Sequence, residues 1–80
     1  MAWILCFAQA RDAIGYAKVE WQIAGPQRVE DLWAWLAANH PGSRFLQPHC
    51  RVACNGEYLQ KEGVIMPHDE IALIPPVSGG

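Results

Sequence analysis

The chain has 80 residues, of which 51% are hydrophobic and 18% are charged, and its formal net charge is −2. A chain of this length forms one small domain with a thin core, which leaves no room for a deep substrate cavity and makes an enzyme uncommon. The apolar content argues against disorder, the scattered Lys and Arg residues give no nucleic-acid footprint, and no apolar run approaches the ~18 residues that cross a membrane.

The cysteines indicate the compartment of the cell. Cys6, Cys50 and Cys54 are an odd number without regular spacing, which is typical of a reducing environment, so we expect a cytoplasmic location. The apolar run at the N-terminus has no preceding basic segment and no clear cleavage site. We therefore interpret it as a strand and not as a signal peptide.

The first quarter of the chain predicts an antiparallel hairpin. Residues 3–8 form a short apolar run, which is typical of a buried strand. Residues 9–15 form a polar connection with room for one helical turn. Residues 17–23 alternate between apolar and polar side chains, with Val19 and Trp21 on the same face, which indicates a half-buried strand.

The next segment predicts the main helix. Its apolar residues recur at i, i+3, i+4, i+7 and i+8, which places them on one helical face. These residues are Val29, Leu32, Trp33, Leu36 and Ala37. Glu30 and Asp31 lie in the first turn, where their charge suits the helix dipole, and Pro41 predicts the end of the helix. Because Trp35 lies off the apolar stripe, we expect its indole to be exposed.

The second half of the chain predicts three more strands. The expected strands cover residues 51–55, 57–59 and 70–74, and a loop covers residues 61–69. Asn55-Gly56 is a strong turn signal between the first two. The last strand ends where two prolines follow it, because a proline has no backbone N–H to give to a sheet.

The order strand, strand, helix, strand, short strand, strand predicts an α+β protein with the β-grasp (ubiquitin-like) fold. We expect a mixed four- to five-stranded sheet with one main helix packed across it. The first and last strands would lie side by side at its centre, which explains why both are apolar at nearly every position. Residues 1–74 would form this domain, and residues 75–80 would form a flexible tail.

The tail is the most informative part of the sequence. It reads Pro75-Pro76-Val77-Ser78-Gly79-Gly80 and reaches at most ~20 Å when extended. The two prolines keep its base extended, and the two glycines carry no Cβ, so their backbone can enter a slot too narrow for other residues. A carboxylate on Gly80 could then enter another protein's active site, be activated as an acyl-adenylate and be attacked by a nucleophile. The chain itself would supply no catalytic side chain.

Four segments resemble the MoaD family, the small sulfur-carrying subunits of molybdopterin synthase within the ThiS/MoaD superfamily. Residues 5–12 (Leu-Cys-Phe-Ala-Gln-Ala-Arg-Asp) are similar to the family's first strand, and residues 29–32 (Val-Glu-Asp-Leu) are similar to its helix entry. Residues 52–58 (Val-Ala-Cys-Asn-Gly-Glu-Tyr) resemble its Val-Ala-x-Asn-x-Glu turn. The ending from Asp69 to Gly80 is close to that of the family throughout, and Pro-Pro-Val-Ser-Gly-Gly is its most specific part.

The resemblance implies a mechanism. An ATP-using, MoeB-like activating enzyme would adenylate the carboxylate of Gly80, and a sulfur donor would convert it to a thiocarboxylate. The tail would then enter the MoaE-like large subunit, in a heterotetramer, and give its sulfur to the dithiolene of a pterin precursor. The chain itself would bind no cofactor and no metal.

The resemblance also implies which residues bind partners. Positions near the tail dock on the partner in the family, and here they correspond to Phe7, Tyr58 and Ile74, with residues 75–78 of the tail beside them. As core residues Phe7 and Ile74 would need no function, and this alternative stays open. In contrast, exposed apolar side chains next to a reactive tail would suit docking.

Three positions depart from the pattern of the family. Arg28 stands where a helix-capping Thr is frequent, so the helix start would depend on another group. Asp12 replaces a more common Glu, and Cys54 stands where an apolar residue such as Val is usual. None of the three touches the tail.

Other functions remain open from the sequence. The chain could carry sulfur for another pathway, such as thiamin thiazole synthesis or tRNA thiolation, or be a β-grasp interaction module whose tail is never activated. His49, Cys50 and Cys54 could suggest a zinc site, but zinc requires four ligands and a fourth is not evident. A Cys/His nucleophile would need an orienting third group and a pocket.

Overall fold

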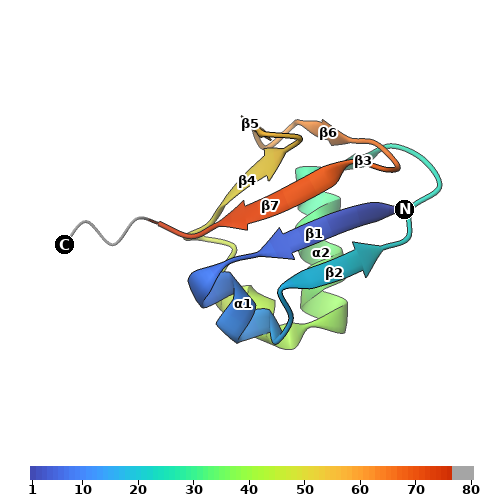
Figure 1. The fold of residues 1–80 in the computed structure, drawn as a ribbon. Helices are drawn as coiled ribbons and strands as arrows, with labels where there is room; N and C mark the ends of the chain where they lie inside the picture. Colours follow the sequence, from blue (N-terminus) through green and yellow to red (C-terminus); the bar gives the residue numbers. More distant parts are fainter. Residues whose placement is uncertain (77–80) are drawn as a thin grey trace.

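The two most apolar strands lie side by side in the centre of a sheet (Figure 1). The computed structural model describes residues 1–76, which form a mixed five-stranded sheet in the order β2-β1-β7-β4-β5. β1 is parallel to β7, and the other pairs are antiparallel. The predicted α+β, β-grasp arrangement is confirmed. The strands are β1 (Ala2–Cys6), β2 (Lys18–Trp21), β4 (Arg51–Cys54), β5 (Glu57–Tyr58) and β7 (Glu70–Ile74).

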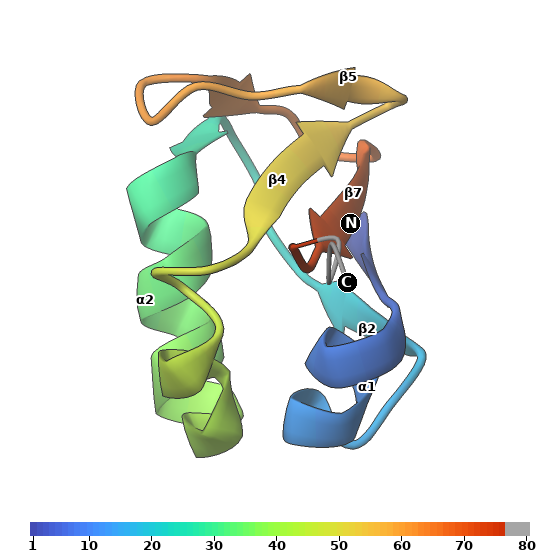
Figure 2. The same cartoon turned by 90° about the vertical axis from the view of Figure 1, so that its left-hand side faces the viewer.

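Helix α2 (Val29–Asn39) packs across one face of the sheet, as its apolar stripe predicts (Figure 2). Val29, Leu32, Trp33 and Leu36 of the stripe are buried. Arg28 offers no side-chain acceptor for the first turn. Instead, the carboxylate of Asp31 accepts a hydrogen bond from the backbone N–H of Arg28 at 2.9 Å, so this acid is the group that fixes the helix start.

The core lies between α2 and the inward-facing side chains of the central strands. Successive residues of a strand point to opposite faces, so alternate positions of β1 and β7 reach this core. Ile4, Ile71 and Leu73 are fully buried there and belong to the same cluster as Leu32 and Leu36 of α2. Their neighbours in the strands point to the other face of the sheet.

The connection after β1 contains a longer helix than we expected from the sequence. Residues Ala8–Ile14 form helix α1, whereas the sequence indicated room for one turn only. Ala10 and Ile14, one helical turn apart, are buried and hold α1 in place. Two apolar positions among polar neighbours are too few to give a clear helical period. Gly15 ends the helix with φ of 94°, a left-handed conformation that glycine adopts without strain.

Three short elements were not predicted. A 3₁₀ helix, η1 (Pro41–Phe45), follows α2 and packs between α2 and α1. Two strands, β3 (Gln27–Arg28) and β6 (Val64–Ile65), pair antiparallel in a second sheet. The segment 61–69 is therefore a loop with a strand inside it, and the fully buried side chain of Ile65 anchors that loop.

The prediction that Trp35 is exposed was wrong. Its indole is half-buried against the core and lies 5.9 Å from the ring of Trp21 and 5.8 Å from that of His40, between ring centroids. Because β2 lies at the edge of the sheet, Trp21 reaches the flank of α2 beside its main stripe. The most exposed aromatic side chains of the described part are Phe45 and Tyr16, at 81% and 62%.

Candidate functional site

One face of the sheet has no helix packed on it within residues 1–76. α1, η1 and α2 contact one another in series on the opposite side (Figure 2). The open face carries the alternate residues of the central strands. Leu5 of β1 and Ala53 of β4 are both register partners of Ala72 in β7, so the three side chains form one row across the sheet. This row lies next to the end of β7, from which the tail continues.

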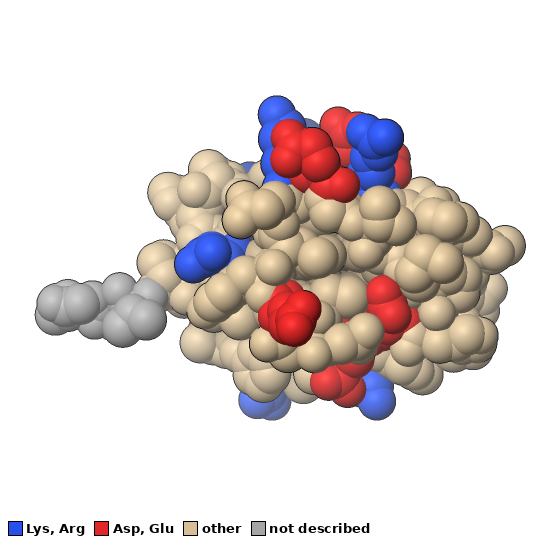
Figure 3. Space-filling model, turned by 90° about the horizontal axis from the view of Figure 1, so that it is seen from above, with Lys and Arg blue, Asp and Glu red and all other residues tan. Residues whose placement is uncertain are grey.

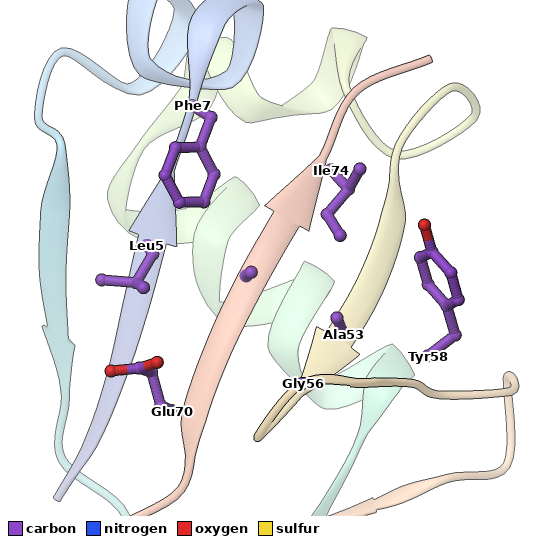
Figure 4. Close-up of a pocket in the computed structure, with 8 residues that line it drawn as sticks. Leu5, Phe7, Ala53, Gly56, Tyr58, Glu70 and Ile74 are labelled. Carbon is purple, nitrogen blue, oxygen red and sulfur yellow. The ribbon is translucent and has the colours of Figure 1, made fainter. Parts of the chain in front are cut away.

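The row forms the floor of a pocket that we call the sheet pocket. It has a volume of about 350 Å³, and Figure 4 shows its walls from the open face. Phe7 and Leu5 stand on the β1 side, and Tyr58 and Ile74 stand on the other. The residues that line it are Leu5, Phe7, Ala53, Gly56, Tyr58, Glu70, Ala72 and Ile74. The three residues that the resemblance implied for docking thus line one hollow.

The exposure of Phe7 follows from its place in the chain. It is the residue between β1 and α1, with extended backbone angles, and its carbonyl oxygen accepts a hydrogen bond from the N–H of Ala10 at 2.9 Å. This turn leaves the ring 52% exposed, so Phe7 is a surface residue and not a core residue. An exposed phenyl ring beside an apolar pocket is a feature of interaction surfaces.

Tyr58 is held by a neighbouring cation. Its ring is 53% exposed, and the guanidinium of Arg51 lies over it at 3.8 Å from the ring centroid. Arg51 is also the register partner of Ile74, so its backbone lies at the base of the tail. Such a stacked pair contributes about 0.5–1 kcal/mol at an exposed site and keeps the tyrosine ring in one orientation.

The tail itself is only partly described. Ile74 and Pro75 are half-buried and Pro76 is exposed, so the chain leaves the sheet at the rim of the sheet pocket. Val77, Ser78, Gly79 and Gly80 lie outside the described residues, and their roles stay predictions. Viewed from above, the surface is mostly uncharged. Basic and acidic side chains lie together along one edge of this view, and the other charged side chains are scattered (Figure 3).

Sequence reasoning missed part of the pocket. Leu5, Ala53, Ala72 and Glu70 line it but were not singled out from the sequence. Their alternation along the strands could have found three of them, because Leu5 lies on the same face as Phe7, and Glu70 and Ala72 lie on the same face as Ile74. No sequence signal could have placed Ala53 beside Ala72, since that depends on the register of β4 against β7.

The cysteines do not form a reactive or metal-binding group. Cys50 precedes β4 and Cys54 ends it, so at ~3.3 Å per residue they stand about 13 Å apart. The residues that the structure describes hold no cluster of three or more potential metal ligands. All three cysteines are free, and burial raises the pKa of each thiol, that of Cys6 to about 11. They therefore stay protonated at neutral pH, which makes them poor nucleophiles.

Cys54 has a structural partner that the sequence did not suggest. Its Sγ donates a hydrogen bond to Oδ2 of Asp69 at 3.2 Å. Burial, together with that bond and the negative charge of Asp69, raises the pKa of the thiol to about 12. Asp69 also accepts hydrogen bonds from the backbone N–H of Met66 at 2.8 Å and from Nδ2 of Asn55 at 3.0 Å. This cluster joins the β4–β5 turn to the start of β7.

A second hollow lies at the other end of the sheet. It has a volume of about 530 Å³ and is lined by Met1, Gln22, Ile23 and Ala24. These residues lie at the start of β1 and just after β2, away from the end of β7. The lining side chains carry no group that could act as acid, base or nucleophile.

Among the helices that the structure describes, none combines the length and the apolar character of a membrane span.

Comparisons with known proteins agree on one family. The family described as ThiS matches residues 4–80. The molybdopterin synthase sulfur carrier subunit of Chlamydomonas reinhardtii is 34% identical over 79 residues, which cover 96% of this chain and 95% of that protein.

Solved structures have the same fold. The structure of SAMP1 from Haloferax volcanii matches with a TM-score of 0.85 and 29% identity, over 99% of this chain and 98% of that one. A chain in the complex of subunits 1 and 2 of molybdopterin-converting factor from Helicobacter pylori matches with a TM-score of 0.71 and 21% identity. That match covers 99% of this chain and 97% of the other, and it shows the fold alone.

Proposed function

Because this chain belongs to the ThiS family, we propose that it is the sulfur carrier subunit of a molybdopterin synthase and works through Gly80. The relative from Chlamydomonas reinhardtii, which bears that name and is similar over nearly the whole length, carries the proposal. The structure adds a second support, since an apolar pocket with exposed Phe7 and Tyr58 lies at the base of the tail. A carrier needs both a reactive end and a surface for its partners.

The chemistry takes place on the carboxylate of Gly80. A carboxylate oxygen attacks the α-phosphate of ATP in the site of an activating enzyme, and pyrophosphate leaves. A hydrosulfide ion (HS⁻) supplied by a sulfur donor then attacks the acyl carbon, AMP leaves with the oxygen, and loss of the S–H proton gives the thiocarboxylate. In the synthase the sulfur moves to the pterin precursor, and water restores the carboxylate. A dithiolene holds two sulfur atoms, so two charged carriers serve each pterin.

The tail has the properties that this chemistry requires. Pro75 and Pro76 fix two φ angles and have no N–H for a sheet, so the extended form loses less entropy when it enters a partner. Gly79 and Gly80 lack a Cβ, which lets the backbone enter a narrow channel. In this proposal residues 1–74 are the docking body, and residues 75–80 are the segment that is inserted.

The partners are an ATP-dependent activating enzyme and the large subunit of the synthase. Docking would bury Phe7, Tyr58 and Ile74 together with the base of the tail. The name of the Chlamydomonas relative as a subunit supports a large-subunit partner. We propose a heterotetramer with two carriers, and a cytoplasmic location in keeping with three free cysteines.

The test is the intact mass of the chain after incubation with ATP, a sulfur donor and the activating enzyme. We expect a mass shift equal to one oxygen replaced by sulfur, and we expect deletion of Gly80 to abolish it. Gly79→Ala should slow charging at least about tenfold with an unchanged melting temperature, because its Cβ would obstruct the channel. Equal charging rates for Gly79→Ala and the wild type would contradict the channel argument.

A transfer assay then identifies the pathway. The charged chain is mixed with a pterin precursor and the large synthase subunit, and the dithiolene product is measured. Charging without transfer would favour a carrier for thiamin thiazole synthesis or tRNA thiolation. No charging with a competent enzyme would favour an interaction module.

A further inference from the structure

The sheet pocket has the shape of a socket for one bulky side chain. The smallest side chains of its floor are the methyl groups of Ala53 and Ala72, which lie side by side as register partners. Larger side chains, Phe7 and Tyr58 among them, rise on opposite walls (Figure 4). A cavity of about 150 Å³ already holds benzene, so the 350 Å³ of the sheet pocket are enough for a large apolar side chain.

The sheet pocket is also electrically asymmetric. Glu70 lines it at the start of β7, and Ile74 lines it at the end, so about 13 Å of strand separates the two. The acidic end is the one away from the tail. The end near the tail has Arg51, whose guanidinium is stacked on Tyr58 and whose backbone pairs with Ile74.

Two carboxylates and one lysine lie near the acidic end of the sheet pocket. The register neighbour of Glu70 in β1 is Trp3, and the neighbour of Trp3 on its other side is Glu20. Lys18 lies over the indole of Trp3 at 4.4 Å, so one ammonium group stands among two carboxylates. A partner that covers the sheet pocket would remove water from Glu70 without providing a counter-charge, unless it brings a cation of its own.

We propose that the sheet pocket receives a bulky apolar side chain of the large subunit and that a lysine or arginine beside that side chain pairs with Glu70. This inference rests on the proposed function, because it specifies how the carrier docks on its synthase partner. The apolar side chain provides the buried contact. Glu70 provides orientation, because the carrier then docks with its acidic end on a basic group and its tail at the opposite end. An apolar contact alone would not distinguish this docking orientation from the reversed one.

The experiment measures the affinity of the purified large subunit for four variants at low and high salt. Glu70→Lys should weaken binding about tenfold or more at low ionic strength, and the loss should shrink at about 0.5 M salt, where charges are screened. Glu70→Gln keeps the size of the side chain and should weaken binding about threefold at low salt. Ala72→Leu fills the floor and should weaken binding at both salt concentrations.

Glu62→Lys is the matched control, since Glu62 is exposed in the turn after β5 and does not line the sheet pocket. It has the same change of charge and should alter the affinity less than about twofold. Equal affinities for Glu70→Lys and Glu62→Lys at low salt would overturn the role of Glu70. Unchanged binding of Ala72→Leu would overturn the socket. Melting temperatures close to the wild type exclude unfolding as the cause.

The two proposals fail in different ways. Charging of the wild-type chain, measured by intact mass, tests the carrier function without any variant of the sheet pocket. If the wild type is charged and Glu70→Lys binds as tightly as Glu62→Lys, only the docking inference is wrong. If the wild type neither accepts sulfur nor binds the large subunit, both proposals are wrong.

Discussion

The two faces of the central sheet are built from the same strands but differ in what covers them. On one face Ile4, Ile71 and Leu73 have no accessible surface, because α2 packs against them. On the other face Leu5 and Ile74 are half-buried, and no helix of the described part lies over them. Adjacent residues of one strand therefore face a core on one side and an open pocket on the other.

The contrast separates residues that hold the fold from residues that are free to bind. A covered side chain contributes to the stability of the isolated chain. An open apolar side chain contributes most when a partner covers it, because only then does its surface leave water. Leu73 and Ile74 make the comparison directly, since they are neighbours in β7 and differ mainly in the face that they occupy.

The largest expected effect is on the covered face. Leu73→Ala should lower the free energy of unfolding by about 2–5 kcal/mol, because it leaves a cavity in a core that cannot fully collapse. Ile74→Ala removes a similar number of carbons, yet it should cost less than about 1.5 kcal/mol, since its side chain is only half-buried. Chemical denaturation of both variants measures the difference. Similar losses for the two would contradict the division between the faces.

The open face should show the reverse behaviour. Phe7→Ala should weaken binding of the large subunit by about tenfold or more, as expected for an aromatic anchor in the centre of an interface. Its cost in stability should stay below about 1 kcal/mol, because the ring is already 52% exposed. Binding by calorimetry and unfolding by denaturant would be measured on the same preparation. A large drop in melting temperature with unchanged affinity would assign Phe7 to the core.

The sequence predicted the covered face better than the open one. The period of α2, the alternation in β2 and the bounds of β7 all follow from the spacing of apolar residues, because burial selects them directly. Spacing failed where an element is too short to show a period. α1 has only two buried residues, and β3 and β6 have two residues each.

The open face depends on contacts between distant residues. The tail and Phe7 could be singled out from local sequence, but the sheet pocket exists because Ala53 and Ala72 are small and lie opposite each other. The burial of Trp35 also depends on a residue that is distant in the sequence. Its position on the helix suggested exposure, and only the place of Trp21 at the edge of the sheet explains why it is half-buried.

The smallest expected effect concerns Asp69, which lies where the two faces meet. Its carboxylate binds Cys54, whose side chain is on the covered face, and Asn55, which lies in the exposed turn beside the sheet pocket. The hydrogen bond from the backbone N–H of Met66 is the main cause that holds the pKa of Asp69 below its usual value, with Asn55 and Cys54 adding to it and burial opposing it. The folded chain thus favours the ionised carboxylate.

The sign of the pH dependence follows from that lowered pKa. The stabilisation is complete well above the unfolded pKa of about 3.9 and is lost as the pH falls through the lower folded value. Asp69→Asn should therefore cost about 1 kcal/mol at pH 7 and clearly less once the pH falls below the lowered pKa of the folded state, where the wild-type carboxyl is protonated too. Denaturation of both proteins across this range isolates the contribution of Asp69, because the other carboxyl groups are common to both. A pH-independent difference would mean that Asp69 acts by its shape and not by its charge, and that the two faces are joined by packing alone.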